Sequence, residues 1–127
     1  MRVLLDTHIA LWAVTGNRRL SQYARQAILA ADEVYVSAAT VWEIAIKHAL
    51  GKGDMPVASG QALQAFRDAG YELLEVKPEH VVRVQDLPPI HKDPFDRLLV
   101  AQAVHEPLTL LTGDPLVIQY SEGIMQV

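Results

Sequence analysis

Short apolar segments alternate with stretches of helical periodicity along the chain, and this alternation constrains the fold more than any other feature of the sequence. The clearest apolar segments are residues 3–5, 34–36 and 108–111. Each has the length of a strand whose two faces are both buried, and helical patterns separate them. Strands of this kind form parallel sheets that helices cover on both sides. The sequence therefore predicts an α/β fold with a central parallel sheet.

Residues that begin or end helices set the expected bounds of the other elements. Ser21 and Pro78 are placed to begin helices, and Gly51 to end one. Helices are predicted over residues 8–14, 22–31, 38–50, 62–68, 78–87 and 95–105. Strands are predicted over residues 3–5, 34–36, 71–76, 108–111 and 124–127. Residues 51–60, which include Pro56 and three glycines, are predicted to form a loop.

The length and composition of the chain fit one domain whose core consists of apolar side chains alone. The chain has 127 residues, half of them hydrophobic, and no cysteine, so disulfides and thiolate metal ligands are excluded. Asp6 and His8 interrupt the apolar start of the chain, which argues against a cleaved signal peptide. No stretch reaches the about 18 apolar residues of a membrane span. We therefore expect residues 1–127 to form a single domain in the cytoplasm.

Four acidic residues stand near the ends of predicted strands or the starts of predicted helices: Asp6, Glu43, Asp96 and Asp114. Asp6 directly follows the first predicted strand, Asp114 follows the fourth, and Glu43 lies in the helix after the second. Asp96 lies in the first turn of its helix. The carboxyl ends of parallel strands meet at one edge of the sheet, and such folds bind ligands there. We therefore predict that the four acids gather at this edge.

Each acid also has a structural interpretation. Asp6 is placed to cap a helix, and Asp93 is placed to cap another. Glu43 stands four residues before Lys47, which is the spacing of a helical salt bridge worth ~0.3–0.5 kcal/mol. Asp114 is followed by proline, as Asp93 is. Capping and metal binding are compatible roles for one carboxylate, so both interpretations stay open.

A cluster of carboxylates in apolar surroundings favours a bound cation. Glu43 lies between Trp42 and Ile44, and the helix over residues 95–105 is apolar almost all round, so its acid Asp96 is expected to be buried as well. Neighbouring carboxylates raise one another's pKa values, and a divalent ion removes that penalty. Oxygen ligands favour Mg²⁺ or Mn²⁺. With a net charge of −4, the chain would need such ions to bind a phosphate backbone.

Four motifs resemble those of a known family. They are VLLDTH at residues 3–8, WEI at 42–44, HKDPFDRLLVAQA at 91–103 and LLTGD at 110–114. In this order and spacing they cover essentially the whole chain. They resemble PIN-domain proteins, and among these they are most similar to the VapC-type toxins of bacterial type II toxin–antitoxin pairs. The segment at 91–103 is the most specific of the four.

The resemblance implies a PIN-like three-layer α/β/α sandwich and a ribonuclease that depends on Mg²⁺ or Mn²⁺. It implies catalytic and metal-binding roles for the four acids Asp6, Glu43, Asp96 and Asp114, and accessory roles for three neighbours, Asp93, Thr7 and Thr112. It further implies a homodimer and a cognate antitoxin protein. The expected reaction is hydrolysis of an RNA phosphodiester bond by a metal-activated water, without a protein nucleophile.

Basic and aromatic residues have predicted roles around this site. His91, Lys92 and Arg97 lie within the same motif as Asp93 and Asp96 and are predicted to hold the RNA backbone. The alternative is a solvated or acid-paired side chain. Trp12 and Trp42 fall on apolar helix faces and are predicted to be core or dimer contacts. The five histidines are scattered and lack the spacing of a zinc site.

Two other functions remain open at this point. A Mg²⁺-dependent phosphatase would use Asp6 as a nucleophile, but such enzymes place a second aspartate two residues later, where this chain has His8. A non-catalytic α/β module that binds a partner protein would use the acids only as caps. RNA fragments, free phosphate or no product at all would separate the three.

Overall fold

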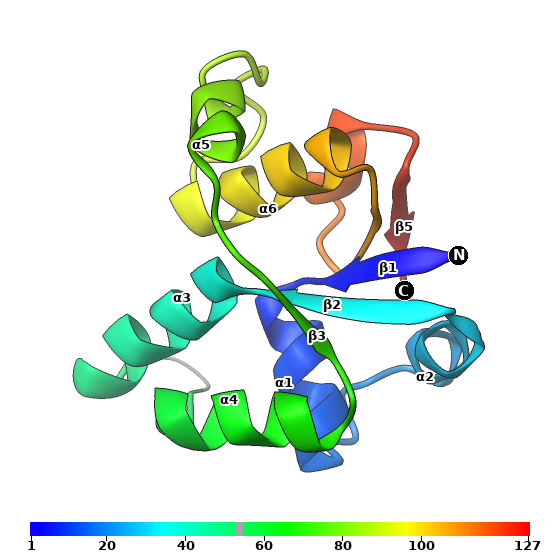
Figure 1. Ribbon diagram of the computed structural model, residues 1–127, viewed down its shortest axis with the longest axis vertical. Coiled ribbons are helices and arrows are strands. Elements are labelled where there is room, and N and C mark those ends of the chain that lie inside the picture. The colour runs from blue at the N-terminus through cyan, green and yellow to red at the C-terminus, as the bar shows by residue number, and fades with distance from the viewer. Residues whose placement is uncertain (53–54) are drawn as a thin grey trace.

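The computed structural model describes residues 1–52 and 55–127, and a five-stranded sheet runs through its centre (Figure 1). The strands are β1 (Arg2–Leu5), β2 (Glu33–Ser37), β3 (Glu72–Leu74), β4 (Thr109–Thr112) and β5 (Ile124–Gln126). They stand in the order β3-β2-β1-β4-β5, and every neighbouring pair is parallel. The predicted parallel sheet is therefore confirmed.

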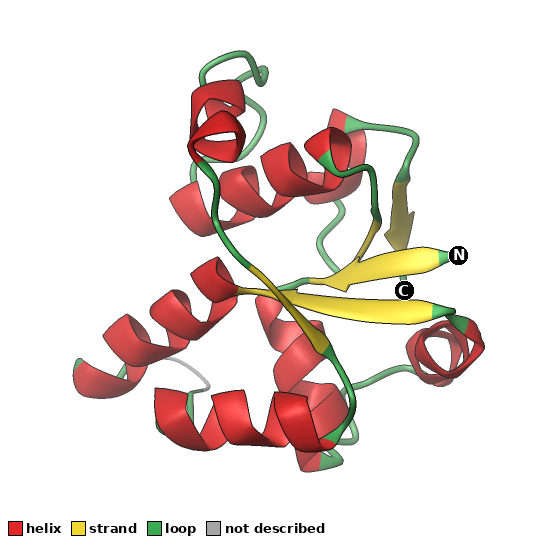
Figure 2. Cartoon of the chain, in the orientation of Figure 1, coloured by secondary structure: helices red, strands yellow, loops and turns green. Residues whose placement is uncertain are grey.

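Helices cover both faces of this sheet. They are α1 (Thr7–Thr15), α2 (Gln22–Ala30), α3 (Ala38–Ala49), α4 (Ser59–Asp68), α5 (Pro78–Val84), α6 (Pro94–His105) and the short 3₁₀ helix η1 (Val117–Tyr120). Figure 2 shows α1, α2 and α4 on one face and α5 and α6 on the other, while α3 leaves the carboxyl end of β2. The three-layer α/β/α sandwich implied by the resemblance is confirmed.

Two hydrophobic cores, one on each face of the sheet, explain why residues 3–5 of the central strand β1 are all apolar. Val3 and Leu5 of β1 belong to the core that includes residues of α1 to α4. Leu4 belongs to the other core, with residues of α6 and η1. All three side chains are fully buried. Because side chains alternate between the faces of a strand, a strand that is buried on both faces is apolar at consecutive positions.

The chain passes from β1 into α1 without a loop, and Asp6 makes this turn. Its Oδ1 accepts a hydrogen bond from the N–H of Ile9 (2.9 Å), so Asp6 is the N-cap of α1. Gly16 ends α1 with a φ of 65°. Ser21 caps α2 and Asp93 caps α6 through their side chains, as predicted. Because Asp6 and Asp93 are themselves caps, the positions of their carboxylates relative to α1 and α6 are fixed.

Some bounds differ from the prediction. α4 begins at Ser59 rather than at residue 62, because the side chain of Gln61 accepts the N–H of Ala58 and stabilises an earlier first turn. η1 was not predicted, since one short turn has no regular apolar spacing. The predicted loop over 51–60 includes residues 53 and 54, which lie outside the described residues. Among the helices of the described ranges, none is long and apolar enough to cross a membrane.

Candidate functional site

Asp6 lies at the carboxyl edge of the sheet, where β1 and β4 run side by side. Its N–H donates to the carbonyl of Leu111 (3.1 Å) and so extends the β1–β4 pairing by one residue. Its Oδ2 accepts a hydrogen bond from the hydroxyl of Thr112 (2.6 Å). Burial raises the pKa of Asp6, while the hydrogen bonds from Thr112 and Ile9 oppose this rise. A buried carboxylate of this kind gains from a nearby cation.

Glu43 enters the same region from α3 and is buried. The hydroxyl of Thr7 donates to its Oε1 (2.6 Å) and also contacts the hydroxyl of Thr40 (3.1 Å). The ammonium of Lys47 donates to its Oε2 (2.5 Å), so the predicted helical salt bridge is confirmed. Glu43 and Asp6 act on one another electrostatically, because the charge of Glu43 raises the pKa of Asp6.

Asp96 is a second carboxyl of the site with a raised pKa. Burial, together with the charges of Asp93, Asp6 and Glu43, raises its pKa to about 7, although His91 acts to lower it. Asp93 caps α6, because its Oδ1 accepts the backbone N–H groups of Phe95 and Asp96. The structure therefore brings Asp6, Glu43, Asp93 and Asp96 close enough for each charge to act on the same group.

Asp114 completes the set and is paired with His91. Nε2 of His91 lies 2.8 Å from Oδ2 of Asp114 and 3.3 Å from Oδ2 of Asp96. Burial acts to raise the pKa of Asp114, but hydrogen bonds from the N–H of Leu116 and from His91 bring it below its ordinary value. From the sequence, His91 was predicted to contact RNA, and its position between Asp96 and Asp114 was not predicted. The available signal was its distance of two residues from Asp93, whose N–H donates to Nδ1 of His91 (3.0 Å).

These acids surround a pocket of about 360 Å³. It is lined by residues from α1, from the segment before α6, from α6 and from the loop after β4: Asp6, His8, Ile9, Trp12, His91, Asp96, Gly113 and Asp114. Glu43 is buried beside this pocket and does not line it. Three of the four predicted acids thus line one pocket, and the fourth, Glu43, is buried next to it.

The donor set fits a hard divalent cation. One ligand atom each from His91, Asp96 and Asp114 lie within 4.8 Å of one another, and Asp6 lines the same pocket. Because Nδ1 of His91 accepts the N–H of Asp93, the proton of the neutral ring belongs on Nε2, which then cannot ligate a metal. The ligands that remain are carboxylate oxygens, which suit Mg²⁺ or Mn²⁺.

The predicted RNA-binding cations differ in their surroundings. Lys92 is exposed beside the site. The guanidinium of Arg97 donates to the carbonyls of Pro88 (3.0 Å) and Val84 (3.1 Å) and to the hydroxyl of Tyr120 (3.1 Å). That hydroxyl accepts the N–H of His91 (2.7 Å). Arg97 therefore fixes the segment that carries His91 into the site.

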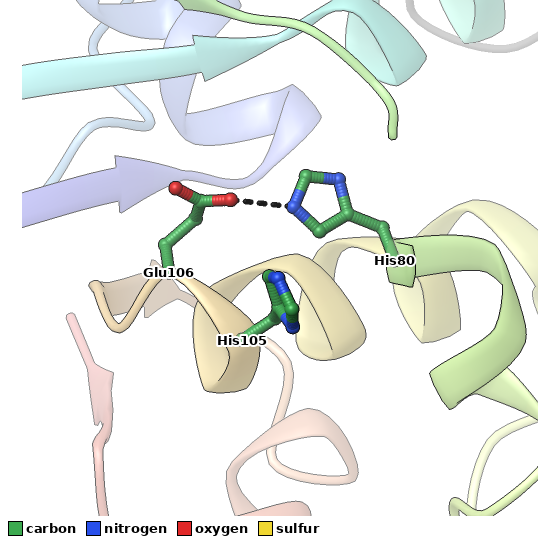
Figure 3. A group of neighbouring side chains, drawn as sticks. All are labelled: His80, His105 and Glu106. Atoms are coloured by element: carbon green, nitrogen blue, oxygen red, sulfur yellow. Dashed lines mark hydrogen bonds and ion pairs between the residues drawn. The ribbon is translucent and has the colours of Figure 1, made fainter. Parts of the chain in front are cut away.

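A second cluster of histidine and acid joins α5 to α6 away from this site (Figure 3). Nε2 of the buried His80 lies 2.6 Å from Oε2 of Glu106, and its Nδ1 accepts the N–H of Lys77 (3.0 Å). Nδ1 of His105 accepts a hydrogen bond from Nε of Arg83 (2.9 Å). Since a donor occupies each Nδ1, each neutral ring keeps its proton on Nε2 and offers no lone pair to a metal. The cluster is a structural link between the two helices.

Comparisons with known proteins agree with this geometry. The chain is 32% identical to Ribonuclease VapC22 of Mycobacterium tuberculosis over 113 residues. This alignment covers 88% of this chain and 86% of that protein. A toxin–antitoxin complex from Klebsiella pneumoniae contains a chain of the same fold, with a TM-score of 0.68, 20% identity, and coverage of 98% of this chain and 96% of that one. A chain of VapBC2 from Rickettsia felis, bound to a DNA fragment from its promoter, has a TM-score of 0.66 at 16% identity, over 100% of this chain and 98% of that one. The model of the PIN domain family matches residues 3–121. The chain therefore belongs to the PIN domain family.

Proposed function

We propose that this chain is a metal-dependent endoribonuclease, the VapC-type toxin of a type II toxin–antitoxin pair, and that residues 1–127 act as one domain. One observation carries the proposal: Asp6, Asp96 and Asp114 line a single pocket in a chain of the PIN domain family. The relative from M. tuberculosis, which is named a ribonuclease, supports RNA as the substrate.

Asp6, Asp96 and Asp114 would hold Mg²⁺ or Mn²⁺. When bound, the ion lowers the pKa of a water molecule and neutralises charge on the scissile phosphate. Thr112 fixes the carboxylate of Asp6 through its hydroxyl, and His91 fixes that of Asp114. Each carboxylate thus keeps one orientation, which limits the reorganisation that the reaction requires. Lys92, exposed beside the pocket, is proposed to contact the RNA backbone.

The protein is proposed to act as a homodimer in the cytoplasm. An apolar groove of about 580 Å³ runs between α3, α5 and α6, and Trp42, Val76 and Val81 line it. Trp42 is 58% exposed, so it is not a core residue in the single chain. Apolar surface gathered in this way is typical of a protein interface. Partnership with an antitoxin is proposed because structures of the same fold are of toxin–antitoxin complexes.

A phosphatase mechanism fits the site less well. Position 8 is His8, so the second aspartate of such enzymes is missing. Free inorganic phosphate as the product would nevertheless identify a phosphatase, which makes product analysis part of the test.

The test is incubation of the purified protein with total cellular RNA and Mn²⁺, followed by mapping of the cut ends. Wild type is expected to release defined RNA fragments, and Asp6→Asn none, with its fold intact by circular dichroism. Addition of EDTA should stop cleavage by wild type. Cleavage that survives both EDTA and Asp6→Asn would contradict the proposal, and the absence of product together with the absence of Mn²⁺ binding would favour a binding module.

A further inference from the structure

The acid cluster contains a cation of its own, the ammonium of Lys47. It lies 2.5 Å from Oε2 of Glu43. The Lys47 side chain is 30% exposed, whereas that of Glu43 is 4% exposed. The charges of Asp93 and Asp96 also act on Lys47. Apart from its salt bridge with Glu43, Lys47 has no part in the chemistry proposed above.

Lys47 and Thr7 together occupy Glu43. Thr7 donates to Oε1 and Lys47 to Oε2. The oxygens of Asp6 also have partners, but these are neutral groups, whereas Oε2 of Glu43 faces an ammonium. Glu43 is also outside the lining of the pocket that Asp6, Asp96 and Asp114 share. The site is therefore divided into an open half with three carboxylates and a closed half in which an ammonium stands beside the fourth.

A divalent ion and this ammonium exclude one another at Glu43. Mg²⁺ binds a carboxylate oxygen at about 2.1 Å. An ion on Oε2 of Glu43 would therefore lie within about 5 Å of the ammonium of Lys47, which is 2.5 Å from the same oxygen. Like charges at that distance repel strongly where water is largely excluded, as it is around Glu43.

We infer that Lys47 takes the place of a second divalent ion, so that the site binds one ion, at Asp6, Asp96 and Asp114, and Glu43 acts without ligating it directly. Lys47 is in this sense a positioning residue, because it holds Glu43 and sets the number of ions. The inference rests on the proposed function, in that it takes the acid cluster to be a metal site.

The test counts Mn²⁺ ions bound to the metal-free protein, by calorimetry and by the electron paramagnetic resonance signal of free Mn²⁺. Wild type should bind one ion and Lys47→Met two, because Glu43, Asp93 and Asp96 lose their internal counter-ion. Lys47→Arg should bind one ion. Lys77→Met, which makes the same change in net charge at an exposed position away from the site, should also bind one. One ion in Lys47→Met, or two in wild type, would overturn the inference.

A second variant keeps the inference testable if Lys47→Met does not fold. Glu43→Gln removes the carboxylate but keeps its shape, and it should still bind one ion, since Glu43 is not a direct ligand. Loss of Mn²⁺ binding in Glu43→Gln would overturn the inference by making Glu43 a ligand. If wild type itself binds no Mn²⁺, the proposed function fails as well. If wild type binds one ion whatever stands at position 47, only the role of Lys47 fails.

Discussion

The hydroxyl of Thr112, at the end of β4, donates a 2.6 Å hydrogen bond to Oδ2 of Asp6, the residue that follows β1. The two residues are 106 positions apart in the sequence. The bond joins two neighbouring strands at the edge where the site forms, and it fixes an acid that also caps α1. The geometry of the proposed metal ligands therefore depends on the same contacts that hold the sheet and the helix together.

Thr112→Val should weaken both the fold and the metal site. The variant keeps the shape of the side chain but leaves a buried oxygen of Asp6 without its donor, which costs about 1–3 kcal/mol. The pKa of Asp6 should rise further, because the bond from Thr112 lowers it. Urea unfolding and Mn²⁺ titration at pH 7 measure the two effects. Thr112→Ser, which retains the hydroxyl, is the control, and a Thr112→Val protein with the stability of wild type would contradict the prediction.

Mn²⁺ affinity should increase as the pH rises from 6 to 8. The ion binds the charged form of Asp96, whose pKa is about 7, so below that pH the metal competes with a proton. Affinity should fall on the order of tenfold per pH unit below the pKa. Calorimetry at pH 6, 7 and 8 measures the slope. Asp96→Asn should bind weakly with a smaller slope, whereas Asp114→Asn should keep the slope, because the pKa of Asp114 is lowered. Equal slopes in the two variants would contradict the assignment of this pH dependence to Asp96.

Arg97 and Lys92 should affect cleavage in different ways. Arg97→Met removes the hydrogen bonds to the carbonyls of Val84 and Pro88 and so displaces His91; kcat should fall on the order of 10- to 100-fold. Lys92→Met removes an exposed charge, so KM should rise and the salt dependence of RNA binding should decrease. Steady-state cleavage of one RNA at two salt concentrations separates the effects. A change confined to KM in Arg97→Met would mean that Arg97 contacts the RNA directly.

Trp42→Glu should convert the dimer into a folded monomer. Trp42 is more than half exposed in the apolar groove, and a buried charge at the centre of an interface is strongly unfavourable. Light scattering after gel filtration gives the mass of the particle. Leu29→Glu, at an even more exposed position on α2, should leave the dimer intact. A wild-type protein that is monomeric at all concentrations would remove the basis of this prediction.

Local patterns in the sequence were sufficient to predict the sheet, its helices and the caps. Asp6 and Asp93 cap α1 and α6 as predicted, since a cap depends only on residues within one helical turn. The gathering of the acids was predictable as well, because it follows from parallel strands that end at one edge.

The arrangement around His91 was not predictable in this way. It depends on Arg97, Tyr120 and the carbonyls of the segment before α6, which meet only after η1 packs against α6. Contacts between η1 and residues 91 and 97, which are more than 20 positions away, leave no periodic signal in the sequence. For the same reason Arg97, which looked like a candidate for RNA binding, turns out to be engaged by main-chain carbonyls.

The most direct measurement of the central claim is the anomalous difference density of Mn²⁺ in crystals of the wild-type protein soaked with the ion. We expect one strong peak within ligand distance of carboxylate oxygens of Asp6, Asp96 and Asp114, and no peak between Glu43 and Lys47. A peak at the cluster of His80 and Glu106 alone, or no peak near Asp6, would contradict it.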